Sequence, residues 1–217
     1  MLRGSARGAA LVEFQVVLLL CLLPLLLGLL QLGLLLLDSP VLHYATFQAA
    51  RAGALAGADP SVMRRALSVG LMPLHVVSDK PLSAAEAPAV AAAAYARSLA
   101  DVALFARLTQ LRPDAAAFQD FATDSAQGPV IRNDSLLHRS TALGTRSGLS
   151  VQQANVLQIR VDWCAPLVVP LVDRLLVGLL RSVDADIHSQ LCYAADRIPM
   201  RATAAVNMQS DVRFHGD

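Results

Sequence analysis

One uncharged apolar segment, residues 16–37, constrains the fold of this chain more than any other feature. It holds 22 residues, and Gln31 is its only clearly polar member. At about 1.5 Å per residue it forms a helix of roughly 33 Å, enough to cross the ~30 Å hydrocarbon core of a bilayer. A buried core helix is the alternative, but such helices usually keep a polar stripe. We therefore expect a transmembrane helix.

A cleaved secretory signal is another interpretation of such a segment. The apolar region of a signal peptide should hold about 7–15 residues and end in a small-x-small cleavage site. Here the run is longer and ends in Leu37-Asp38-Ser39. Three leucines precede Cys21, so the small residues of a lipoprotein processing site are missing and Cys21 is read as an ordinary apolar helix residue.

The charges on either side of the apolar segment predict its orientation. Arg3 and Arg7 precede it, whereas Asp38 follows it and the next arginine is Arg51. Lys and Arg accumulate on the cytoplasmic side of membrane helices. This predicts a single-pass protein with a cytoplasmic N-terminus and with residues 38–217 outside the cytoplasm.

A short basic leader precedes the apolar segment and ends in Gly8. Glu13 is the fifth residue after Gly8, and Phe14 follows it. A carboxylate at the edge of a membrane helix is expensive to bury, so such acids are candidates for function. Cleavage after Gly8 would free the amino group of Ala9, which would then pair with Glu13 of a neighbouring helix at matching depth. The alternative is that Glu13 simply lies among the lipid headgroups.

Three stretches of the first quarter of the chain resemble a known family. The stretch Arg-Gly-Ala-Ala-Leu-Val-Glu-Phe at residues 7–14, then residues 31–33, then residues 48–54 together resemble the TadE-like pseudopilins of the tight-adherence (Flp-type) pilus system. A glycine followed by Glu-Phe and a long apolar helix is similar to the substrates of prepilin peptidases. Two features depart from the family pattern: the early proline lies deeper, at Pro24, and Gln31 stands where a glutamate is common.

The resemblance implies leader cleavage between Gly8 and Ala9, and a role for Glu13 and Phe14 in processing or assembly. It implies a minor pseudopilin that helps to assemble a tight-adherence (type IVb, Flp-type) pilus or a related secretion apparatus by packing of membrane helices. Its partners would be the bacterial inner membrane, a prepilin peptidase, and other pilins, pseudopilins and pilus assembly proteins. The alternative function is a signal-anchored periplasmic binding module of the cell envelope.

The rest of the sequence predicts an α+β protein that is mostly helical. We divide it into a leader (1–8), a transmembrane helix (9–37), a stalk helix (38–58) and an extracytoplasmic α+β domain (59–217). The transmembrane helix is expected to continue into this pilin-like stalk, with Asp38 or Ser39 able to cap the part that begins near Pro40. Capping and proline signals predict three further helices. These are expected over residues 60–71, from Ser83-Glu86 to about 111, and from Pro113-Asp114 to 121, with a loop over 124–150.

Two segments near the C-terminus, 156–164 and 200–208, alternate apolar and polar residues with the period of a half-buried strand. We expect them to pair antiparallel, with a buried or membrane-surface helix within residues 165–180. Cys164 and Cys192 lie close to these strands, and in an oxidising periplasm they would form a disulfide. Two free buried thiols are the alternative.

The sequence offers no clear catalytic or ligand-binding motif. The five histidines form no His-Glu-x-x-His motif, and no Gly-rich phosphate loop precedes a helix. His138 and His188 are expected to be surface or loop residues. The net charge of +1 gives no electrostatic reason to expect nucleic-acid binding. We expect no enzymatic activity, no metal site, no cofactor and no nucleic-acid partner.

Overall fold

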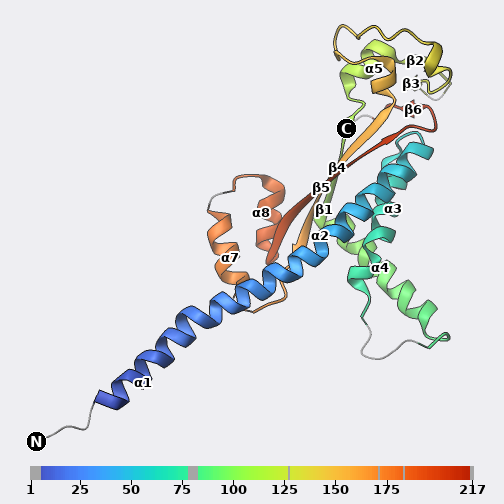
Figure 1. Cartoon of the computed structure of the whole chain (residues 1–217). Coiled ribbons are helices and arrows are strands. Elements are labelled where there is room, and N and C mark those ends of the chain that lie inside the picture. Colours follow the sequence, from blue (N-terminus) through green and yellow to red (C-terminus); the bar gives the residue numbers. More distant parts are fainter. Residues whose placement is uncertain (1–5, 78–82, 127, 171, 183, 216–217) are drawn as a thin grey trace, which may run out of the picture. The chain divides into compact units, whose positions relative to one another are not determined.

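A computed structural model describes residues 6–77, 83–126, 128–170, 172–182 and 184–215. The chain is an α+β protein, as expected (Figure 1). It forms two compact units. The first comprises residues 1–38 and 164–199, and the second comprises residues 39–163 and 200–217. The boundaries fall inside a helix and two strands, which therefore contribute to both units.

The N-terminal part is one long run of helix. Helix α1 (Ala6–Val17) continues through a π-helical segment, η1 (Leu18–Leu22), into α2 (Leu23–Leu55). Among the described residues this is the one helix that is long and apolar enough to cross a membrane. Its most apolar part is almost entirely exposed, which is the opposite of what a core helix of a soluble protein shows.

Helix α2 passes through Pro40 without a break, so the apolar helix continues into the following stalk residues, as expected. A proline inside a helix removes one backbone hydrogen bond and usually bends or ends the helix. The residues that follow offset this cost by packing, since Leu42, Ala45 and Ala49 are fully buried. Tertiary contacts therefore outweigh the local preference for a helix end at this proline.

The first unit adds a helical hairpin to the first part of α2. The C-terminal end of strand β4 (Val156–Pro166) leads into α7 (Val172–Arg181) and α8 (Ile187–Ala194), and β5 (Arg197–Asn207) starts the return. Helix α7 confirms the helix expected within residues 165–180. Helix α8 was not expected; its first turn is capped by Asp186, whose carboxylate accepts from the Ser189 N–H.

The second unit contains a three-stranded sheet in the order β1-β4-β5. Strand β1 (Ala106–Arg112) is antiparallel to β4, with Ala106 opposite Trp163. The predicted pairing of the two C-terminal strands is confirmed, because β4 and β5 are neighbours. The apolar residues of the alternating pattern in β4, Leu157, Ile159, Val161 and Trp163, are buried as expected. The pattern is broken at Asp162, which is buried as well.

Three further helical segments belong to the second unit: α3 (Pro60–Leu71), the short η2 (Met72–His75) and α4 (Ala87–Phe105). Helix α3 confirms its prediction, and Asp59 caps it. The predicted extension of the next helix to residue 111 is wrong, because residues 106–112 pair with β4 as a strand. Helix α3 also approaches α2 closely: a Cβ at Gly70 would lie 2.5 Å from the Ala45 Cα.

A second small sheet, in the order β2-β3-β6, completes this unit. It consists of β2 (Thr123–Ser125), β3 (Gly128–Ile131) and β6 (Val212–Arg213). The expected loop over 124–150 therefore contains a hairpin, whose strands are too short to show a periodic pattern. The remaining helical elements are α5 (Ala115–Phe121), which was predicted, η3 (Leu136–His138) and α6 (Val151–Ala154).

Candidate functional site

The residues of the N-terminal motif all lie on one helix. Gly8, Ala9, Glu13 and Phe14 belong to α1, and the side chains of Glu13 and Phe14 are exposed. Among the described residues, none forms a hydrogen bond or an ion pair with the Glu13 carboxylate. The part of the chain that the structure describes thus offers this carboxylate no partner.

Gln31 is the second notable residue of the long helix, and only 1% of its surface is exposed. Its Oε1 accepts hydrogen bonds from the backbone N–H groups of Val168 (3.0 Å) and Val169 (2.9 Å). Its Nε2 is buried without a hydrogen-bond partner among the described residues. The sequence marked Gln31 as the polar residue of an apolar run but gave no sign that a loop 137 residues later binds it.

Gln31 lies on the less exposed face of α2. Around Gln31, the half-buried positions share one side of the helix, while the residues between them are exposed. Spacings of three and four residues place such positions on one face. They are Pro24, Leu27, Gly28, Leu34, Leu35 and Asp38. One face of the C-terminal half of the apolar helix is therefore less exposed than the other.

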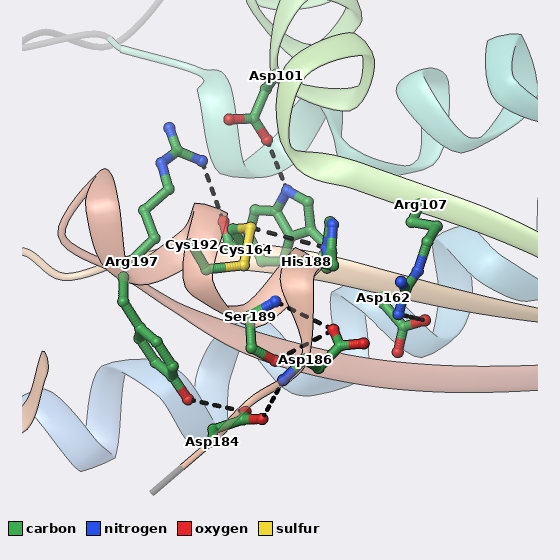
Figure 2. Close-up of a disulfide and its surroundings, with 12 residues drawn as sticks. Asp101, Arg107, Asp162, Cys164, Asp184, Asp186, His188, Ser189, Cys192 and Arg197 are labelled. Atoms are coloured by element: carbon green, nitrogen blue, oxygen red, sulfur yellow. Dashed lines mark hydrogen bonds and ion pairs between the residues drawn. A yellow bond between two sulfur atoms is a disulfide. The ribbon is translucent and has the colours of Figure 1, made fainter. Parts of the chain in front are cut away.

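The predicted disulfide is present between Cys164, near the end of β4, and Cys192 on α8 (Figure 2). Both cysteines are fully buried. His188 lies one helical turn before Cys192, and its Nε2 is 3.8 Å from the Cys164 Sγ. The expectation that His188 is a surface residue is wrong: it is only 9% exposed, because α8 turns it toward the disulfide.

The ligand atoms of Cys164, His188 and Cys192 lie within 4.8 Å of one another. Two thiolates and an imidazole would suit a zinc ion. A disulfide sulfur is not a thiolate, however, so with the bond intact this cluster acts as a covalent link. Closing a loop with a separation of 28 residues contributes about 3.5 kcal/mol in the chain-entropy model.

Polar contacts around the disulfide hold the same region together (Figure 2). Arg197 donates to the backbone oxygen of Cys164 at 3.0 Å, and the Tyr193 hydroxyl donates to Asp184 at 3.2 Å. Burial, followed by the nearby negative charge of Asp184, raises the pKa of Tyr193. These contacts tie α8 and the loop before it to the strand ends, which is a structural role.

In the second unit, Asp162 is a buried carboxylate surrounded by three arginines. It accepts from Arg201 Nε at 2.6 Å and from Arg107 Nη2 at 3.3 Å, and Arg160 Nε lies 3.5 Å away. The side chain of Asp162 is only 5% exposed. The sequence placed Arg160 and Asp162 on the polar face of the strand, but nothing in it indicated that two other strands would supply further arginines.

Asp101 forms a second buried polar contact in this unit. The Trp163 indole N–H donates to its carboxylate at 2.6 Å, and His75 Nε2 lies 3.7 Å away. The Asp101 contact links α4 to β4.

An open groove of about 560 Å³ lies elsewhere in this unit, lined by residues of α2 and α3 that include Tyr44, Gln48 and Arg51. Its lining is mainly apolar and includes one cation, Arg51.

Comparison with known proteins gives no match: no family model, no curated protein and no solved structure corresponds to this chain.

Proposed function

We propose that this protein is a minor pseudopilin that takes part in assembling a tight-adherence (Flp-type) pilus or a related secretion apparatus. It is held in the bacterial inner membrane by residues 9–37, with residues 38–217 in the periplasm. The observation that carries the proposal is the spacing of Gly8, Glu13 and Phe14 directly before a long apolar helix.

The exposure of the long helix supports membrane anchoring. Large apolar side chains are exposed along it from Val12 to Leu37. Such a surface is stable in lipid or against other helices but not in water. A helix that must pack laterally against other membrane helices needs such an uncovered surface.

The distribution of cysteines is consistent with a periplasmic domain. Cys164 and Cys192 both follow the apolar segment and are joined, whereas Cys21 lies within it and is free. Disulfides persist in oxidising compartments such as the bacterial periplasm and are rare in the cytosol.

The proposed mechanism depends on charge pairing at the edge of the membrane. Cleavage after Gly8 gives Ala9 a positively charged amino group, and Glu13 lies four residues further along the helix. When the amine of one subunit meets Glu13 of the next, the two helices are staggered by about 6 Å. Pairing removes the cost of leaving a lone carboxylate at the membrane edge, so it favours one register over others.

Glu13→Ala tests this mechanism in cells that assemble the pilus, with leader processing and surface pili as separate readouts. Glu86→Ala is the matched control, because Glu86 is the chain's other glutamate and lies on the domain surface, bonded to Ser83. We expect Glu13→Ala to abolish assembly or processing and Glu86→Ala to leave both intact. Normal processing and normal pili in the Glu13 variant would show that the carboxylate has no such role.

A signal-anchored periplasmic binding module is the alternative function. The groove of about 560 Å³ between α2 and α3 favours it, since an apolar groove with one exposed cation suits a peptide or a small ligand. Such a protein would keep its leader and would not require Glu13.

A further inference from the structure

We propose that residues 167–170 and helix α7 form a membrane-surface collar that lies among the lipid headgroups and fixes the depth of the anchor helix through Gln31. The collar would recognise the anionic headgroups of the outer face of the membrane. It rests on the membrane anchoring proposed above, but on neither leader cleavage nor a role in pili.

The distance between two polar residues sets the depth. Gln31 follows Glu13 by 18 residues, which corresponds to about 27 Å of helix. This is close to the ~30 Å thickness of the hydrocarbon core. With Glu13 at the inner edge of the core, Gln31 lies at its outer edge, and Leu32–Leu37, about 9 Å of helix, cross the outer headgroup layer.

The hydrogen bonds of Gln31 then fix the depth of the collar loop relative to the membrane. Unpaired amide and backbone N–H groups are costly inside hydrocarbon. Gln31 Oε1 pairs with the N–H groups of Val168 and Val169, so these three groups satisfy one another at the boundary. The headgroup layer is only about 6 Å thick on each side. A loop bonded directly to Gln31 must therefore lie at or within this layer.

The side chains of the collar suit that environment. Val168 and Leu179 are 69% and 66% exposed, although Val172 and Val177 on the same segment are buried. Arg174 and Arg181 are also exposed, and their guanidinium groups make no ion pair among the described residues. An amphipathic helix that carries exposed leucine and unpaired arginines is typical of membrane interfaces, where the arginines meet anionic headgroups.

The collar also restricts how the anchor helix meets other molecules. Its loop is bonded to α2 on the face that carries Gln31, while Leu29, Leu32 and Leu36 on the other side stay exposed. Lateral packing of a second membrane helix would thus be limited to the uncovered side in the outer half of the membrane.

Spin-label depth measurements on the full chain test the collar. The protein carries Cys21→Ala, keeps its disulfide and is placed in nanodiscs of phosphatidylethanolamine and phosphatidylglycerol. Single nitroxides replace Val168 or Leu179, Leu20 marks the membrane interior, and Leu143, which is 64% exposed in the other unit, is the matched control. Accessibility to oxygen is compared with accessibility to a water-soluble nickel chelate.

We expect Val168 and Leu179 labels to be shielded from nickel relative to Leu143 and to lie between it and Leu20. Nickel accessibility equal to that of Leu143, with Leu20 immersed, would refute the collar and leave the anchor intact. A Leu20 label open to nickel would refute the anchor itself.

Two sets of variants test the Gln31 hydrogen bonds and the arginine charges of the collar separately. Gln31→Leu removes the acceptor, so we expect the Val168 label to move into water while Leu20 stays immersed; Gln31→Glu keeps an acceptor and should retain the depth. Arg174→Gln with Arg181→Gln should raise the nickel accessibility of the Leu179 label in the same nanodiscs. Arg64→Gln with Arg65→Gln, an equal loss of exposed charge on α3, should not. Unchanged depth in both test variants would overturn the proposal.

Discussion

Replacing Asp162 by asparagine should destabilise the second unit far more than replacing an exposed aspartate. The Asp162 carboxylate is nearly fully buried and accepts from Arg201 and Arg107, with Arg160 also within 4 Å. Asparagine has almost the same shape, but it removes the charge that balances three guanidinium groups. The variant therefore tests the electrostatics of the cluster and not its packing.

The expected loss follows from the number and exposure of these contacts. A hydrogen bond to a charged group contributes about 1.5–3 kcal/mol, roughly twice a neutral one, so neutralising two such bonds costs about 1.5–3 kcal/mol in total. Breaking a fully buried ion pair costs about 3–5 kcal/mol. The guanidinium groups here are 32–61% exposed and can rehydrate, which favours the lower estimate. We expect a loss of about 2 kcal/mol.

Urea unfolding of the full chain in detergent measures this loss through Trp163, the only tryptophan, which is buried in the adjacent position of β4. Asp134→Asn is the control, since Asp134 pairs with Arg139 at the surface and exposed pairs contribute about 0–1 kcal/mol. Equal unfolding free energies for the two variants, or no loss for Asp162→Asn, would refute the stabilising role of the cluster.

Three further predictions concern stability. Reduction of the disulfide should destabilise the first unit by about 3.5 kcal/mol in the chain-entropy model, measured as faster hydrogen exchange in α7 and α8; unchanged exchange would contradict it. Gly70→Ala should cost about 1–3 kcal/mol of unfolding free energy because its Cβ would meet Ala45, whereas Gly178→Ala, where the added Cβ meets nothing within 4 Å, should be neutral or stabilising. Hydrogen bonds from Ser147 lower the pKa of Asp120 below its ordinary value, so its stabilising contribution is complete above about pH 4 and lost as the pH falls through the folded pKa. Asp120→Asn should flatten the decline of the thermal midpoint on the acid side, and an unchanged profile would show that other carboxyl groups cause it.

Local signals predicted the elements whose residues follow a clear pattern. Asp59 and Asp114 cap their helices as their positions before a helical run suggested. The alternation in β4 also predicted that its apolar side chains are buried, although not the burial of Asp162 among them. In each case the determining interaction lies within a few residues of sequence, or within a single amphipathic period.

The sequence failed where distant segments determine the structure. Residues 106–112 follow an alanine-rich helical stretch that was expected to reach residue 111, yet they form β1 because β4 pairs with them. Gln31 is bonded to a loop more than a hundred residues away, and His188 is buried because α8 turns it toward the disulfide. No local pattern encodes these contacts, since they depend on how the segments pack.

The N-terminus of the protein recovered from its native membrane tests the proposed function most directly. A pseudopilin loses its leader, so the account predicts a mature chain that begins at Ala9, determined by N-terminal sequencing or intact mass. A chain that still begins at Met1 in cells with an active prepilin peptidase would contradict the proposal, and the protein would then be a signal-anchored envelope protein.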